Sequence, residues 1–182
     1  MTKNSTWRPL ALSLTTLGAI VRLVPHPPNF APVGATALFA GARLPTWQAY
    51  LVPLALMAIT DPIYAAVYHT PIYSPYQILI YLSFMISVWL GRRLRGTESI
   101  PKIAAVTLLG SVQFFLLSNF SSWIFFQMYP RTAAGLLACY TAAIPFFGWT
   151  LASDVLYSAV LFGLYALLTR TIAANERVAA TA

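Results

Sequence analysis

Long apolar runs alternate with short polar segments along the whole chain. Seven such runs occur, at about residues 10–24, 32–42, 48–67, 76–90, 103–126, 133–147 and 150–169. A helix needs about 20 mostly apolar residues to cross a bilayer, with a range of about 17–25. The pattern therefore predicts a compact bundle of transmembrane helices, and the basic residues between the runs indicate how many of them cross.

The basic residues favour six crossings with both termini in the cytoplasm. Lys3 and Arg8 precede the first run, and further basic residues crowd the turns expected on the same side, namely Arg43, Arg92, Arg93, Arg95 and Lys102. Seven crossings would place Arg170 and Arg177 on the outer side, against the excess of Lys and Arg in cytoplasmic loops. Six crossings keep them inside, with spans at about 10–24, 32–43, 48–67, 76–91, 103–126 and 149–169.

The run that does not cross in this interpretation is 133–147, AAGLLACYTAAIPFF. It is short, it ends near Pro145, and it follows Tyr129-Pro130-Arg131, which falls in an expected outer loop. We expect a re-entrant or interfacial helix there, before the last span. Irregular backbone at membrane depth is tolerated only where protein or a water-filled cavity surrounds it.

The segment RLVPHPPNF, residues 22–30, interrupts the apolar pattern. Its three prolines end the first helix, because proline lacks an amide donor and restricts the residue before it. The second helix, 32–43, then rises only about 18 Å, against an apolar layer of about 30 Å. We expect the loop above it to dip into a cavity that opens to the outside; the alternative is a merely kinked hairpin.

Composition supports the membrane class. The chain has 182 residues, of which 59% are hydrophobic and 8% are charged, where a soluble domain has about 25% charged residues. Its mean hydropathy is +0.71. The chain has a net charge of +7, and its basic residues lie between the apolar runs and form no solvated patch. We therefore expect the lipid bilayer rather than nucleic acid as its partner. Cys139 is the single cysteine, which excludes a disulfide within the chain.

Polar groups gather in the outer half of the predicted bundle. Asp61 and Asp154 lie inside apolar spans, where carboxyl groups usually face a cavity or a partner. Asn119 is expected at a similar depth. With flat rings and loop residues they form the candidate ligand-binding set: His26, Asn29, Phe30, Asp61, His69, Asn119, Trp123, Trp149 and Asp154. The alternatives are an interfacial aromatic belt, interfacial loop histidines, and acids that cap helices or pair with Arg22 or Arg131.

Small residues recur at four-residue spacing on the first helix, at Ala11, Thr15 and Ala19. In lipid, small residues at such spacing let helices approach closely. This stripe predicts either packing within the chain or a docking face for a partner membrane protein.

No catalytic constellation is present, so we expect neither enzyme activity nor a cofactor. The chain has no serine elbow, phosphate-binding loop or HExxH motif. An aspartyl dyad of Asp61 and Asp154 is the enzymatic alternative, but neither acid lies in a glycine-flanked motif. No segment binds ATP, so energised transport requires the motor of another protein.

Two quoted segments carry a family resemblance. PVGATALFAGARLPTWQAY, residues 32–50, and AIPFFGWTLASDVLYSAVLFG, residues 143–163, resemble parts of the substrate-binding S components of energy-coupling-factor vitamin transporters. In the second segment the Pro-Phe-Phe and Asp154 are similar in kind to the biotin-binding members, but the spacing is longer and the lysine after the aspartate is missing. The pattern from 22 to 168, with MYPRT and GLLACY, also resembles an uncharacterised bacterial family of proteins described as transporters.

The resemblance implies a substrate-binding subunit in the cell inner membrane that takes up a vitamin-type micronutrient. It also implies a transmembrane coupling subunit docked at Ala11, Thr15 and Ala19, together with ATPases. A related group binds cobalamin through a loop cysteine; His69 lies in the corresponding loop, which keeps cobalamin or another metal chelate as a candidate. The alternatives are a stand-alone proton-coupled carrier and a structural or assembly subunit of a membrane complex.

Overall fold

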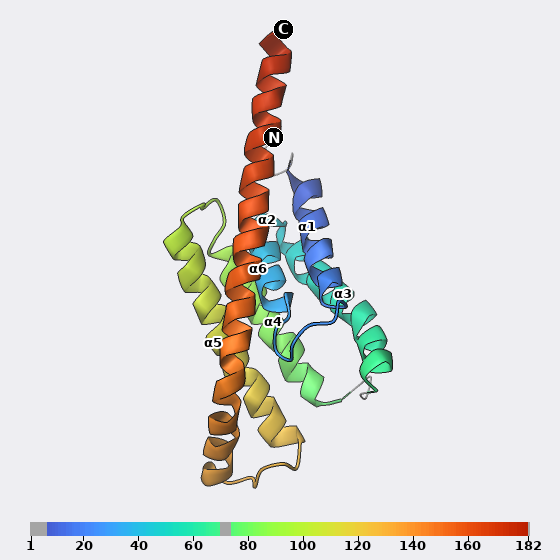
Figure 1. The fold of residues 1–182 in the computed structure, drawn as a ribbon, viewed down its shortest axis with the longest axis vertical. Coiled ribbons are helices and arrows are strands. Elements are labelled where there is room, and N and C mark those ends of the chain that lie inside the picture. The colour runs from blue at the N-terminus through green and yellow to red at the C-terminus, as the bar shows by residue number, and fades with distance from the viewer. Residues whose placement is uncertain (1–6, 70–73, 182) are drawn as a thin grey trace.

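The computed structural model describes residues 7–69 and 74–181 of the chain. In these residues the fold is all-α, with six helices and no strand (Figure 1). The helices are α1 (Arg8–Val21), α2 (Val33–Arg43), α3 (Thr46–Tyr68), α4 (Tyr76–Arg92), α5 (Ile100–Phe125) and α6 (Ala133–Thr181). Lys3, which supports a cytoplasmic N-terminus, lies outside the described residues.

Three of the described helices are long and apolar enough to cross a membrane, namely α3, α5 and α6. The helix α1 is apolar but has only 14 residues. The short second helix that the sequence predicted is confirmed, since α2 has 11 residues. The other predicted helices begin and end within a few residues of α1, α3, α4 and α5.

The division of the last third of the chain into an interfacial helix, 133–147, and a separate span, 149–169, is wrong. A single helix of 49 residues, α6, runs through both segments and includes Pro145. The proline costs one backbone hydrogen bond, but α5 packs against α6 on both sides of it. Phe115 contacts the rings of Tyr140 and Phe147, and the Tyr140 hydroxyl donates a hydrogen bond to the Leu116 carbonyl oxygen at 2.7 Å.

The short helix α2 lies at the centre of the bundle and contacts each of the other five helices. All eight of its residues from 35 to 42 are buried. Its closest approach is to α4, where a Cβ added to Gly41 would lie 2.1 Å from the Val88 carbonyl oxygen. A Cβ added to Gly91 would likewise lie 2.1 Å from the Leu38 carbonyl oxygen. The two backbones therefore touch because glycine occupies both positions.

The small-residue stripe of α1 faces the interior of the same bundle. Ala11 and Thr15 are fully buried and Ala19 is 5% exposed. Beside them, a Cβ added to Gly18 would lie 2.5 Å from Thr36 Oγ1 of α2. The stripe therefore lets α1 pack closely against the central helix of its own chain.

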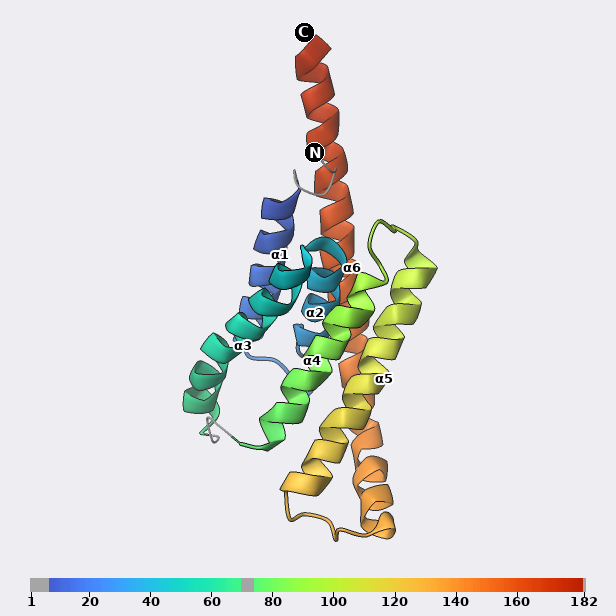
Figure 2. The same cartoon turned by 180° about the vertical axis from the view of Figure 1, so that it is seen from behind.

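Successive helices run in alternating directions, so the first turn of α1 and the last turns of α6 lie at the same end of the molecule (Figures 1 and 2). The last turns of α6 extend beyond the other helices at that end. At the opposite end, the hairpin between α5 and α6 projects beyond α3 and α4. The connection between α1 and α2 also lies on that opposite side, and it covers the site described next.

Candidate functional site

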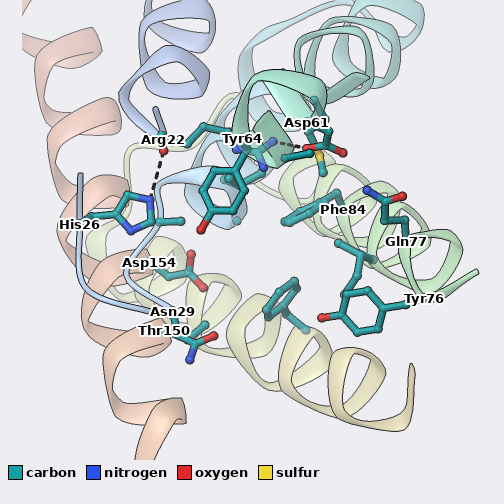
Figure 3. A pocket seen from close by; sticks show the side chains of 17 residues that line it. Arg22, His26, Asn29, Asp61, Tyr64, Tyr76, Gln77, Phe84, Thr150 and Asp154 are labelled. Atoms are coloured by element: carbon teal, nitrogen blue, oxygen red, sulfur yellow. Dashed lines mark hydrogen bonds and ion pairs between the residues drawn. The ribbon is translucent and has the colours of Figure 1, made fainter. Parts of the chain in front are cut away.

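A cavity of about 330 Å³ lies beside the N-terminal end of α2. Figure 3 shows side chains from α3, α4, α6 and the α1–α2 connection facing this common space. We call it the outer cavity, because the sequence predicts these residues in the outer half of the bundle. Its lining residues are Arg22, His26, Asn29, Ala31, Val33, Gly34, Met57, Asp61, Tyr64, Ala65, Tyr76, Gln77, Ile80, Phe84, Phe114, Thr150 and Asp154.

An ion pair joins Arg22, the residue that follows α1, to Asp61 of α3 at one wall of the outer cavity. Arg22 Nη1 lies 2.8 Å from Asp61 Oδ1, and the two side chains are 13% and 11% exposed. The same guanidinium nitrogen donates to Thr60 Oγ1 at 3.0 Å, and the Tyr81 hydroxyl donates to Asp61 Oδ2 at 2.5 Å. The Arg22 guanidinium also lies 5.6 Å from the centre of the Tyr64 ring. These partners offset much of the cost of burying the two charges.

Asp154 of α6 caps the N-terminal end of α2 from across the bundle. The residue before α2, Pro32, supplies no side-chain cap, so the first amides of the helix need another acceptor. The carboxyl group of Asp154 interacts with the Ala35 backbone amide and accepts a hydrogen bond from Ser111 Oγ at 2.7 Å. A Cβ on Gly34 would lie 2.4 Å from Asp154 Oδ1, so glycine is required for this approach.

The connection from α1 to α2 is held in place by the same turn of α6. Ser153 Oγ donates a hydrogen bond to the Ala31 carbonyl oxygen at 2.7 Å. Within the connection, the ring nitrogens of His26 lie 3.1 Å from the Arg22 carbonyl oxygen and 3.0 Å from the Pro27 carbonyl oxygen. Asn29 has a positive φ of 63°, which an asparagine tolerates better than most residues. The proline-rich segment is thereby folded over the outer cavity.

A second cavity of about 150 Å³ adjoins the first, and Asn29, Tyr76, Phe114 and Thr150 line both. Asn119 lies in its wall, with its Nδ2 donating to the Phe115 carbonyl oxygen at 2.8 Å. The two cavities together form a continuous polar and aromatic lining between α4, α5 and α6.

The comparison with known families adds one finding to this geometry. A family described as "Family of unknown function (DUF6580)" matches residues 2–176. The chain belongs to this family. No curated protein and no solved structure matches the chain.

In this member of the family, the structure brings together part of the candidate set that the sequence suggested. His26, Asn29, Asp61 and Asp154 line the outer cavity, and Asn119 lines the adjoining one. His69, Phe30, Trp123 and Trp149 line neither of these two cavities.

The four candidate residues that line neither cavity lie elsewhere in this DUF6580 protein. His69 is exposed at the end of α3, in the left-handed conformation. Trp123 Nε1 donates to the Pro130 carbonyl oxygen at 2.9 Å. Phe30 meets Trp149 edge to face, with ring centres 6.1 Å apart. In the part of the chain that the structure describes, no three His, Cys, Asp or Glu residues lie close enough to hold a metal ion.

Sequence reasoning missed Gln77, Phe114 and Thr150 as lining residues of this family member. Each lies in an apolar helix, and hydropathy does not indicate which way a helix faces. With one arginine, two carboxyl groups, two side-chain amides and several rings in its lining, the outer cavity can hold a compact ligand that has polar groups and a flat or apolar body.

Proposed function

We propose that the chain is a membrane-embedded substrate-binding subunit, similar to the S components, for the uptake of a small vitamin-type micronutrient. The observation that carries the proposal is the outer cavity itself. Ligand sites are typically pre-formed clefts of about 300–1,000 Å³ with apolar walls and a few placed polar groups. A cavity of about 330 Å³ with Arg22, Asp61 and Asp154 in its lining meets that description.

The size of the outer cavity favours a compact vitamin over a corrinoid. Its volume is at the lower end of the range for ligand sites, and a corrinoid with its nucleotide loop is far larger than such a site. His69, the one candidate for metal ligation, is exposed and absent from the lining. We therefore narrow the proposed ligand to a small molecule with at least one polar group for Arg22 or Asp61.

Placement in the inner membrane is part of the proposal. It is supported by the three long apolar helices and by large apolar side chains on their surfaces, such as Ile59, Leu109 and Leu137, which are 62%, 55% and 69% exposed. The alternating helix directions also place Arg43, Arg92 and Arg170 toward the end shared by the first turn of α1 and the last turns of α6 (Figure 1). By the positive-inside rule we expect that end in the cytoplasm. A reporter that works only in the cytoplasm should therefore be active when it is fused to the C-terminus.

Coupling to a transmembrane subunit and ATPases remains part of this proposal, because the sequence contains no ATP-binding segment. Docking through the side chains of Ala11, Thr15 and Ala19 would require α1 to move away from α2, since all three are buried in the bundle. Their burial favours the packing role for the stripe.

The direct test is mass spectrometry of small molecules that co-purify with the detergent-solubilised chain, followed by a titration with the ligand found. Asp61→Asn should weaken binding, because it removes the negative charge that pairs with Arg22 in the cavity wall. Glu176→Gln is the matched control, since Glu176 is an exposed acid on α6 outside the lining. Equal affinities for both variants, or a preparation that carries only lipid, would count against uptake and favour a structural subunit.

A further inference from the structure

A separate groove opens between α5 and α6 in the other half of the molecule. The two helices are joined where Thr107 Oγ1 donates to Ser158 Oγ at 3.1 Å. A hollow of about 420 Å³ lies between them, alongside residues 155–170 of α6. We call it the α5–α6 groove. Its walls are apolar or small side chains, among them Ile103, Ala104, Val155, Ala159, Gly163 and Ala166.

The groove is open to the surroundings of the bundle. A Cβ added to Gly163 would meet no atom within 4 Å, so this glycine does not serve a close contact with α5. Ile100 and Val155, at its two ends, are 78% and 51% exposed. An apolar hollow of this kind on the surface of the bundle requires an apolar occupant.

Charged groups lie only at one end of the groove. Arg43 Nη2 donates to the Thr97 carbonyl oxygen at 2.9 Å, and its guanidinium lies 5.4 Å and 5.0 Å from the ring centres of Phe162 and Tyr165. Its Nε is buried without a hydrogen-bond partner. Arg170 pairs with Glu98 at 2.5 Å. Two arginines and one glutamate leave this end with a net positive charge.

We propose that the α5–α6 groove binds one phospholipid with an anionic headgroup, its phosphate at Arg43 and Arg170 and one acyl chain along α6. The inference rests on the membrane location proposed above but not on the micronutrient. The charge fits a phosphate, because basic residues at a membrane surface attract anionic lipids. The groove from Arg170 to Val155 covers about 22 Å of helix, which suits a headgroup and an acyl chain crossing half of an apolar layer of about 30 Å.

The ends of the groove favour a lipid over the helix of a partner protein. A partner helix would follow α6 through the whole apolar layer and would need small residues along that length. On α6 the lining of the groove ends at Val155, which is bulky and 51% exposed. An occupant that ends within one leaflet is a lipid chain.

The test uses the full chain reconstituted in lipid nanodiscs with a photoactivatable acyl-chain phosphatidylglycerol, followed by peptide mapping. Labelling should concentrate on residues 100–107 and 155–166. Gly163→Leu adds a bulky side chain to the groove, and its Cβ meets no atom within 4 Å, so labelling there should fall about tenfold. Gly148→Leu is the matched control, because Gly148 lies on the same helix, its added Cβ also meets nothing within 4 Å, and it does not line the groove.

The headgroup claim has its own pair of variants. Arg170→Gln should lower labelling about fivefold, whereas Lys102→Gln, an exposed lysine outside the lining, should leave it unchanged. Equal labelling by a phosphatidylcholine probe would overturn the anionic selectivity. Labelling spread evenly over the chain, or unchanged by Gly163→Leu, would overturn the lipid site while leaving the micronutrient proposal intact. A chain that does not enter the bilayer would overturn both.

Discussion

Replacing Asp154 by alanine should destabilise the fold, because this side chain caps the central helix. Asp154 is 4% exposed; its carboxyl group interacts with the Ala35 amide and accepts a hydrogen bond from Ser111 Oγ. Alanine removes this carboxyl group, so the Ala35 amide in the first turn of α2 and Ser111 Oγ both lose it as a partner. Because α2 contacts every other helix, fraying at its first turn should loosen the wall of the outer cavity as well.

The magnitude follows from two contributions. Loss of a capping side chain costs about 0.5–2 kcal/mol. Loss of the Ser111 hydrogen bond costs about 1 kcal/mol, and no more, because Ser111 Oγ also lies 3.2 Å from the Thr107 carbonyl oxygen and keeps that acceptor. We therefore expect about 1.5–3 kcal/mol for Asp154→Ala. Asp154→Asn retains an oxygen acceptor and should lose only the charge at the helix end, about 0.3–1 kcal/mol.

Equilibrium unfolding in mixed micelles, followed by tryptophan fluorescence, measures these differences. Ser111→Ala serves as the control for the hydrogen bond alone, with an expected loss of about 1 kcal/mol. The expected order of destabilisation is Asp154→Ala first, with Asp154→Asn and Ser111→Ala well below it. The capping argument is refuted if Asp154→Ala unfolds within about 0.5 kcal/mol of the parent, which is the range of ordinary surface substitutions.

Three further experiments test the packing. Gly91→Ala places a Cβ 2.1 Å from the Leu38 carbonyl oxygen, so it should cost about 3 kcal/mol or more; unchanged unfolding would contradict the backbone contact. Arg22→Gln and Asp61→Asn should each destabilise the chain, with a coupling of at least about 1 kcal/mol in the double variant; additive losses would show that the ion pair contributes nothing. Ala11→Leu should lower the melting temperature without preventing insertion, because the parent side chain is fully buried; a parent-like melting curve would show that the stripe has no packing role.

Hydropathy and proline placement were enough to predict most helices and the break between α1 and α2. Both signals are local. Pro25, Pro27 and Pro28 remove amide donors wherever the rest of the chain lies, so the short α2 could be expected from its own neighbourhood. The presence of Asp61 and Asp154 in a common site was also foreseeable, because buried carboxyl groups seek a cavity or a partner.

Local signals were misleading at Pro145. A proline near the end of a short apolar run ordinarily marks a boundary, and the prediction placed one there. The structure continues the helix because Phe115 of α5 packs on Tyr140 and Phe147, before and after the proline. Only the contact between two helices offsets the lost backbone hydrogen bond, and residues 20 or more positions apart in the sequence supply that contact.

The sequence by itself determined that this chain is a set of apolar helices, with a break at the prolines and polar groups near one end. Hydropathy and amide chemistry act within a few residues, so they can be read along the chain. Only the tertiary structure decided how each helix is rotated about its axis. That rotation makes Asp154 a cap for α2, joins Arg22 to Asp61, turns Gln77 and Thr150 into the outer cavity, and leaves His69 exposed. Rotation depends on which surfaces of distant helices fit together, as where Gly41 and Gly91 let the backbones of α2 and α4 touch, and no single segment contains that information.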